Sequence, residues 1–521
     1  MSAAPAQEKV RLAELVAALS LGIDLGFGQP MQHVLRQCLI ALRIAEHLDM
    51  DADDRAHLYY TALLVGVGCH SDAHEQAKWF GDDLALKATK YDNEPKSLAD
   101  LKAGLRLLGS GNPPLHRFRI GLEFVVYGAR SMADMITQHA KMARDLADNL
   151  GLPMPVRECL GASYEQWDGK GWPGTLKGVD IPLAARVAYI SEYLEVAHRV
   201  GGLDSARALA RKRSGKQFDP QVAALVVEHG DVIFADLDVI QTWDAVINAE
   251  PSLAVVLDSS AFDSALTAIG NFIDLKSPYT LGHAQGTARL ARDAGTQLGL
   301  DTTDLDLLYR AGMAHGFGRL GVSNSILDRP GPLSAGEWER VRMYPYVTDR
   351  MLRQSPSLAP LGALALQHRE RLDGSGYPRG LEGSSITRLG RVLGAAEAFQ
   401  TKREDRPHRA ALTPTDAAAW MRAEVTAGRL DASAVDAVLK AAGQRTPRRA
   451  DGPSGLTNRE VEVLTLLARG MSNKQIAQRL VITPKTAGNH IEHIYAKIQA
   501  NSRTSAALYA MQHGLIPENS A

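Results

Sequence analysis

A loop rich in glycine and proline occurs twice in this chain, and this repeat constrains the fold more than any other feature. The two copies read QWDGKGWPGTLKGVDIP, at 166–182, and RLDGSGYPRGLEGSSIT, at 371–387. Pro173 of the first loop aligns with Pro378 of the second, an offset of 205 residues. A repeat sets the number of structural units, so it is recognised before single motifs are interpreted. We therefore predict two copies of one body.

The repeat continues upstream with a different offset. HVLRQCLIALRIAEHLDMD begins at His33 and parallels HAQGTARLARDAGTQLGLD, which begins at His283, an offset of 250 residues. The difference between the two offsets gives the first copy 45 extra residues between Val65 and His139. They include the polar stretch HSDAHEQAKWFGDDLALKATKYDNEPK, which we interpret as an insertion that covers the first body or faces a partner.

Apolar residues from Lys9 to about Gly443 recur at the 3.6-residue period of helices, and strand-like alternation is scarce. An all-α fold is therefore predicted, with two tandem helical bundles and a small helical C-terminal domain. The predicted units are 1–230 for the first bundle, 231–261 for connecting helices, 262–442 for the second bundle, 443–455 for a basic flexible linker and 456–521 for the C-terminal domain.

The C-terminal stretch predicts three short helices in close succession. LTNREVEVLTLLARG carries its apolar residues on one helical face and closes at Gly470. Ser472 is placed to cap a second helix, and Thr483 to cap a third helix whose first turn holds Pro484. Side chains on the outer faces suit phosphates and base edges in a major groove. The candidate DNA-binding residues are Lys474, Lys485, Thr486, Asn489, His490, His493 and Lys497.

Together with SRTSAALYAMQHGLI, the stretches LTNREVEVLTLLARGMSNKQIAQRL and TPKTAGNHIEHIYAKI resemble the LuxR-type (NarL/FixJ-type) helix-turn-helix domain. The resemblance implies a four-helix unit, with a last helix over roughly 502–513, that binds double-stranded DNA as a dimer. Where this family has a valine and a basic residue, the chain has Ala487 and Gly488. Gly488 costs about 1 kcal/mol of helix stability relative to alanine. The alternative interpretation is a helical dimerisation tail with a solvated basic face.

The second copy contains the stretches YTLGHAQGTARLA, LYRAGMAHGFGRLGVSNSILDRPGPLSAGEWERVRMYP, QHRERLDGSGYPRGLEGSSITRLGRVLGAAEAF and DRPHRAALTPTDAA. In their order and spacing they resemble the HD-GYP branch of the HD metal-dependent phosphohydrolases. The first copy, with YTALLVGVG and YEQWDGKGWPGTLKGVDIPLAARVAYISEYLE, is a more distant version. The resemblance implies two all-α HD bundles, and it implies that active members hold two or three metal ions with histidines and aspartates.

In the second copy, ligand-type residues remain at His283, His315, His368 and Glu397, a set that holds at most one ion. Other ligand positions differ from the family: Gly316 replaces the aspartate of the HD pair, Arg319 a lysine, Tyr344 the mid-domain histidine, Arg369 the second of a double histidine and Tyr279 an upstream carboxylate. Arg369 also places a fixed positive charge where a second dication would sit. We therefore predict that two-metal hydrolysis is lost.

Fewer ligand positions survive in the first copy. His33 and His139 stand at family positions, and Glu192 replaces the late aspartate. The HD pair reads Val65-Gly66 and the double histidine reads Ser163-Tyr164, so no metal site is drawn there.

A cavity that once held metals and a nucleotide can remain a ligand pocket without catalysis. The candidate pocket residues are His283, His315, Tyr344, His368, Arg369 and Glu397. The plainer interpretation is that the remaining histidines are hydrogen-bonded core residues.

Three cysteines, Cys38, Cys69 and Cys159, form no C-x-x-C pair and fit reduced thiols in the cytoplasm. No stretch is long and apolar enough for a membrane span, and the N-terminus has no signal-peptide pattern. A cytoplasmic protein with no membrane partner is expected.

These observations predict a DNA-binding transcriptional regulator. Two catalytically inactive HD bundles would act as a sensory and dimerisation module for the C-terminal domain. No catalytic residue, cofactor or metal is assigned, although a single ion in the second bundle stays open. The expected partners are double-stranded DNA, a small-molecule effector and a second copy of the chain. The alternative is a residual metal-dependent HD phosphohydrolase, of the cyclic-dinucleotide phosphodiesterase kind, that also binds DNA.

Overall fold

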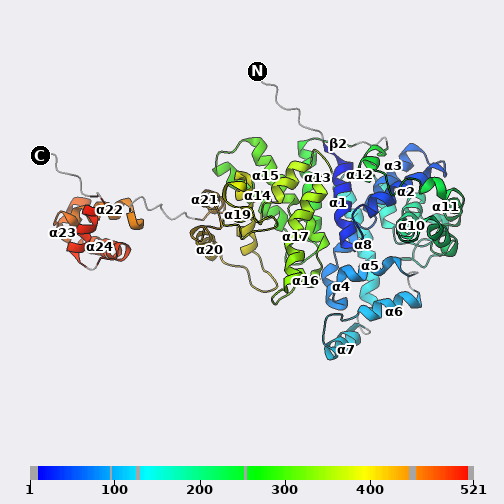
Figure 1. Cartoon of the computed structure of the whole chain (residues 1–521), viewed down its shortest axis with the longest axis horizontal. Helices are drawn as coiled ribbons and strands as arrows, with labels where there is room; N and C mark the ends of the chain where they lie inside the picture. Colours follow the sequence, from blue (N-terminus) through cyan, green and yellow to red (C-terminus); the bar gives the residue numbers. More distant parts are fainter. Residues whose placement is uncertain are drawn as a thin grey trace, which may run out of the picture. The chain divides into compact units, whose positions relative to one another are not determined.

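A computed structural model describes residues 10–93, 97–124, 129–251, 255–444, 453–500, 502–513 and 515. The chain divides into two compact units, Met1–Gln444 and Arg445–Ala521, which are described separately (Figure 1). Helices dominate both units, which confirms the predicted all-α class. The unit boundaries drawn from the sequence stay predictions, and most of the predicted linker 443–455 lies outside the described residues.

The first half of the larger unit contains the helices of the first bundle and begins with a buried N-terminal helix. They are α1 (Leu12–Gly26), α2 (His33–Glu46), α3 (Ala52–Leu64), η1 (Val67–His70), α8 (Ala129–Asn149), α9 (Met154–Gly161), η4 (Gly178–Asp180), α10 (Leu183–Arg213), α11 (Pro220–Ile233) and α12 (Thr242–Asn248). The predicted insertion forms α4 (Ala73–Phe80), α5 (Asp83–Ala88), η2 (Thr89–Tyr91), α6 (Leu98–Leu107) and α7 (Pro114–Glu123).

The second half repeats this arrangement without the insertion. Its helices are α13 (Ser259–Asp274), α14 (His283–Gln297), α15 (Thr302–Ala314), η5 (Phe317–Gly321), α16 (Asn324–Leu327), α17 (Ala335–Leu352), α18 (Ala359–Ala365), η6 (Gly383–Ser385), α19 (Arg388–Lys402), α20 (Pro414–Thr426) and α21 (Ala432–Ala441). The two-residue strands β1 (Val10–Arg11) and β2 (Val256–Leu257) pair antiparallel. β2 and α12 lie in 231–261, where the sequence predicted connecting helices.

The internal repeat is visible in the helix boundaries. α2 and α14 both begin at the histidine that the offset of 250 aligns, His33 and His283. The residue before each histidine, Gln32 or Gly282, adopts the same left-handed conformation. α3 and α15 are likewise capped by aligned aspartates, whose carboxylates accept from the backbone N–H three residues on. The same local sequence chemistry therefore builds the two halves alike.

The N-terminal helix α1 lies between the two halves and packs against helices of both (Figure 1). Leu12, Leu15 and Leu19 are at most 1% exposed, and each fully buried leucine stabilises the fold by about 2 kcal/mol. Gly22 comes so close to α17 that a Cβ there would lie 2.7 Å from Cε of Met351. α1 thus joins the two bundles through one core.

The smaller unit contains η7 (Pro453–Gly455), α22 (Asn458–Ala468), α23 (Asn473–Leu480), α24 (Pro484–Ile498) and α25 (Arg503–Gln512). Thr457, Ser472 and Thr483 cap three of these helices through their side-chain oxygens. Val481 turns the chain between α23 and α24 in a left-handed conformation. None of the helices in the described part of the chain is both long and apolar enough to cross a bilayer.

Candidate functional site

Three buried histidines of the second bundle each direct Nδ1 to an acceptor. Nδ1 of His315 donates to the carbonyl of Gly312 at 2.6 Å, and Nδ1 of His368 donates to the carbonyl of Ala365. Nδ1 of His283 lies 2.8 Å from a carboxylate oxygen of Glu404. Because each Nδ1 carries the hydrogen, each Nε2 is left with a lone pair. Metal-ligating histidines are oriented in this way.

The Nε2 lone pairs of His283 and His315 lie close together, beside the carboxylate of Glu397. Nε2 of His283 lies 3.2 Å from Nε2 of His315 and 3.7 Å from Oε1 of Glu397. One ligand atom from each of these three residues fits within a group 4.8 Å across. The second oxygen of Glu397 is buried without a hydrogen-bond partner among the described residues. Two imidazole nitrogens and a carboxylate oxygen suit a divalent transition-metal ion, so the donor set fits one ion.

Two guanidinium groups donate hydrogen bonds to these residues, one to an imidazole nitrogen and one to the carboxylate. Nη2 of Arg319 donates to Nε2 of His283 at 3.0 Å. Nη2 of Arg369 donates to Glu397 at 2.5 Å, and its Nε donates to the hydroxyl of Tyr344 at 3.1 Å. That hydroxyl donates in turn to Nε2 of His368 at 2.7 Å. The network therefore includes all six candidate pocket residues, together with Arg319.

Burial and the arginine charges keep the histidines of this network neutral. Burial and, to a lesser extent, the charge of Arg319 lower the pKa of His315 to about 3. Burial likewise lowers the pKa of His283 and of His368 well below the usual value. Burial would raise the pKa of Glu397, but the charge of Arg369 beside it holds the pKa well below the usual range. The site thus presents an ionised carboxylate and neutral imidazoles, the protonation states that bind metals.

A pocket of about 800 Å³ opens next to the network. Its walls include the aromatic side chains of Trp338, Tyr344 and Tyr377. Cationic side chains are concentrated in it: Lys276, Arg319, Arg329, Arg369, Lys402, Arg406 and Arg409. A pocket with aromatic walls and many guanidinium groups suits an anionic ligand with planar rings.

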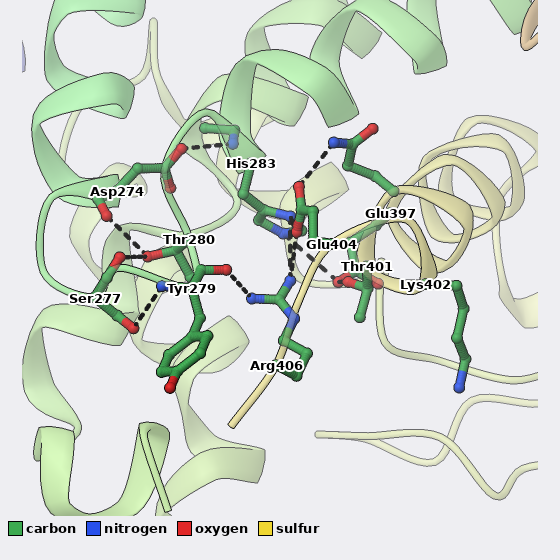
Figure 2. A network of polar contacts seen from close by, with 12 residues as sticks. Asp274, Ser277, Tyr279, Thr280, His283, Glu397, Thr401, Lys402, Glu404 and Arg406 are labelled. Atoms are coloured by element: carbon green, nitrogen blue, oxygen red, sulfur yellow. Dashed lines mark hydrogen bonds and ion pairs between the residues drawn. The ribbon is translucent and has the colours of Figure 1, made fainter. Parts of the chain in front are cut away.

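Arg406 lines the pocket and Glu404 orients His283, and neither residue was among the sequence candidates. Arg406 donates to the backbone carbonyl of Tyr279 and to Glu404, each at 2.6 Å, and Figure 2 shows this arginine beside His283. Glu404 in turn accepts from Nδ1 of His283. The available signal was the dense run of charges in TKREDRPHR, at 401–409, which begins in the last turn of the helix that carries Glu397.

The equivalent place in the first bundle holds a lysine from the insertion. Nζ of Lys90 forms an ion pair with Glu192 and lies between 5.2 and 5.9 Å from four aromatic rings, which belong to Phe27, Tyr91, Tyr164 and Tyr193. His33 pairs with Glu195 instead of facing another histidine. Among the described residues, the group suited to a metal is the one in the second bundle.

The predicted DNA-binding residues occupy α23 and α24. Lys474, Lys485, Asn489 and His493 are exposed, whereas Thr486 and His490 are half-buried. Lys497 differs because its Nζ donates to Glu460 at 2.6 Å and to the carbonyl of Gly455 at 3.0 Å. These contacts tie Lys497 to its own domain. The contacts of all seven residues with DNA stay predictions.

Comparison with known proteins supports both parts of the chain. The HD domain family matches residues 129–222 and 268–434, and the luxR family of bacterial regulatory proteins matches residues 454–510. The 3'3'-cGAMP-specific phosphodiesterase 3 of Vibrio cholerae is 30% identical over 441 residues, which cover 84% of this chain and 95% of that protein. A crystal structure of a cyclic GMP-AMP specific phosphodiesterase of V. cholerae (V-cGAP3) superposes with a TM-score of 0.59 at 26% identity, covering 84% of this chain and 99% of that one. Response regulator protein VraR of Staphylococcus aureus is 43% identical over 79 residues, 15% of this chain and 38% of that protein.

The prediction that the chain is not an enzyme is contradicted by these relatives, because a phosphodiesterase resembles it over most of its length. That prediction counted the replaced ligands, such as Gly316 and Arg369, but not the direction of the lone pairs on the residues that remain. The predicted fusion is confirmed: the chain belongs to the HD domain family and ends in a DNA-binding domain of the luxR family.

Proposed function

We propose that the second bundle is a metal-dependent phosphodiesterase that hydrolyses a cyclic dinucleotide, in a protein whose C-terminal domain binds DNA and regulates transcription. The observation that carries this proposal is the convergence of His283, His315 and Glu397 beside a pocket lined with cationic side chains. The relatives support it, since one is named for its specificity toward 3'3'-cGAMP.

His283, His315 and Glu397 would hold the ion. When bound, such an ion polarises a phosphoryl oxygen and lowers the pKa of a coordinated water. Arg319 and Arg369 lie next to these ligands, and guanidinium groups pair with phosphate oxygens through two parallel hydrogen bonds. These arginines therefore neutralise a phosphodiester group that enters the pocket. They supply charge at positions where the family has a lysine and a second histidine.

The rest of the pocket suits a nucleotide. Trp338 and Tyr377 offer flat apolar surfaces, on which a base gains stacking energy. Arg406 is fixed by Glu404 and the Tyr279 carbonyl at the mouth, where a second phosphate of a cyclic dinucleotide would find a positive charge.

The test is turnover of 3'3'-cGAMP and cyclic di-GMP by the full chain loaded with Mn²⁺ or Fe²⁺, followed by chromatography of the products. We expect hydrolysis that His315→Ala abolishes and that His116→Ala, at an exposed histidine of α7, leaves unchanged. Gly316→Asp restores the family's aspartate, and a Cβ there meets only ordinary contacts with Arg319 at 3.5 Å or more. We expect this variant to be faster than the wild type. If both the wild type and Gly316→Asp bind the nucleotide but hydrolyse none of it, the proposed phosphodiesterase activity is refuted.

We further infer that the occupied pocket controls DNA binding by a homodimer in the cytoplasm. A single helix-turn-helix domain makes few phosphate contacts, so two domains one DNA turn apart are needed for tight binding. Light scattering should give the mass of a dimer, and adding a non-hydrolysable cyclic dinucleotide should change the affinity for operator DNA. If the affinity for operator DNA is the same with and without the nucleotide, the proposed control of DNA binding is refuted, while the proposed phosphodiesterase activity is unaffected.

A further inference from the structure

A cysteine, a histidine and an aspartate of the first bundle contact one another in sequence, and none of them lines the pocket of the second bundle. Sγ of Cys69, in η1, lies 3.3 Å from Nδ1 of His139, in α8. Nε2 of His139 lies 2.7 Å from Oδ2 of Asp72. A nucleophile, an imidazole and a carboxylate in this order form the arrangement that activates thiols and hydroxyls for attack.

The backbone is shaped to bring the first two of these residues together. A Cβ on Gly68 would lie 2.1 Å from the carbonyl oxygen of His139, so only glycine allows η1 to approach α8 this closely. On the far side, Nε2 of Gln76 donates to Oδ1 of Asp72 at 3.1 Å and fixes the carboxylate. The triad is therefore held at both ends.

The charges around Cys69 favour its thiolate. Burial raises the pKa of Cys69, but His139 beside it outweighs that effect and the pKa is lowered. Burial lowers the pKa of His139, but the sulfur of Cys69 and the Asp72 carboxylate raise it to about 10. Lys90 adds a further positive charge, and the hydroxyl of Tyr164 lies 2.9 Å from the sulfur. These neighbours favour the thiolate–imidazolium form of the pair over the neutral thiol and imidazole.

The other two cysteines provide an internal contrast. Burial raises the pKa of Cys38, and it raises the pKa of Cys159 to about 11. All three thiols are buried and free, so burial alone does not separate them. Cys69 differs through its histidine.

Access to Cys69 is restricted to small molecules. The residue is 6% exposed and lines a cavity of about 10 Å³ together with Phe27 and Gly66. Such a cavity holds about one water molecule. Hydrogen peroxide is little larger than water, whereas common alkylating reagents are much larger.

We propose that Cys69 is a modification site, a thiol that hydrogen peroxide oxidises to sulfenic acid with the help of His139 and Asp72. The thiolate sulfur attacks one peroxide oxygen, the S–O bond forms and the O–O bond breaks. The departing hydroxide takes the proton of the His139 imidazolium and leaves as water. Sulfur is oxidised by two electrons, and the peroxide is reduced by the same two.

The test treats the folded full-length protein with hydrogen peroxide at pH 7 for timed intervals, removes the peroxide with catalase and then unfolds the chain in denaturant that contains dimedone, so that the label reaches buried cysteines. Mass spectrometry follows the label at each cysteine. We expect Cys69 to be labelled about tenfold or more faster than Cys38 and Cys159, because an ordinary thiol is mostly protonated at this pH. His139→Gln and Asp72→Asn should slow the labelling of Cys69, with circular dichroism confirming that each variant is folded.

The comparison among the three wild-type cysteines needs no variant, so it decides the proposal even if a substitution unfolds the bundle. Labelling of Cys69 no faster than that of Cys38 and Cys159 overturns the proposal. Unchanged labelling in a folded His139→Gln variant overturns the role of the triad.

Discussion

The guanidinium of Arg369 lies 2.5 Å from the carboxylate of Glu397 in the interior of the second bundle. The first bundle places Lys90 against Glu192 in the corresponding position. Both bundles therefore neutralise the same buried carboxylate with a cation of the chain itself. The two cations come from different parts of the repeat, since Arg369 follows α18 and Lys90 belongs to the insertion.

Replacing Arg369 should destabilise the larger unit. Arg369→Met leaves Glu397, whose side chain is fully buried, without its partner, and breaking such a pair from one side costs about 3 kcal/mol. Urea unfolding measures the change, with Arg379→Met at an exposed position as the control. The double variant Arg369→Met/Glu397→Leu should regain most of the loss. Equal stability of the two single variants would contradict this account.

Asp24 should make stability depend on pH in the opposite sense to an ordinary salt bridge. Burial raises the pKa of Asp24 to about 7, so the folded protein holds a proton that the unfolded chain releases near pH 4. The stability that this bound proton contributes is fully present below about pH 4 and is lost as the pH rises through 7. Asp24→Asn should reduce the gain in stability between pH 7 and pH 5 by about 2 kcal/mol. Parallel pH profiles of the two proteins, from chemical unfolding, would show that Asp24 is not the group responsible.

Gly318 should tolerate no side chain. A Cβ there would lie 2.0 Å from the carbonyl oxygen of Tyr344, so Gly318→Ala should lower the free energy of unfolding by about 3 kcal/mol. A Cβ on Gly336, in α17, would meet no other atom within 4 Å among the described residues, and Gly336→Ala should raise the free energy of unfolding by about 0.5 kcal/mol. Thermal unfolding of both variants checks the contrast. If Gly318→Ala leaves the free energy of unfolding unchanged, η5 and α17 separate easily.

Gly488 should limit DNA affinity. A Cβ at this position meets only Asn473, at 3.7 Å, so a larger side chain fits. Gly488→Lys restores the basic residue of the family and should steepen the salt dependence of binding by about one phosphate contact. Gly488→Ala is the matched control, since it adds about 1 kcal/mol of helix stability without charge. Fluorescence anisotropy over a range of KCl concentrations separates the two effects, and identical slopes would place residue 488 away from the DNA backbone.

The sequence predicted the repeat, the all-α class and the caps of two C-terminal helices, because these depend on local patterns such as Ser472, or Thr483 followed by Pro484. Its six candidate pocket residues lie in one network in the structure, but that network also includes Arg319, Glu404 and Arg406, which were not among them. The sequence could not predict that Lys90 reaches Glu192, or that Glu404 orients His283, since both contacts join segments about 100 residues apart. Lys497 was read as a DNA contact from its helical face, but its pairing with Glu460 depends on how α22 packs.

The ion pair between Lys90 and Glu192 links the insertion to the buried carboxylate of the first bundle. A bundle of this type without the insertion would bury Glu192 against aromatic rings and lack the ammonium group that balances it. Relatives that lack the insertion should therefore carry an uncharged residue at the position of Glu192, or keep enough ligands to bind an ion there. The insertion and a buried Glu192 without metal ligands around it would then be gained or lost together.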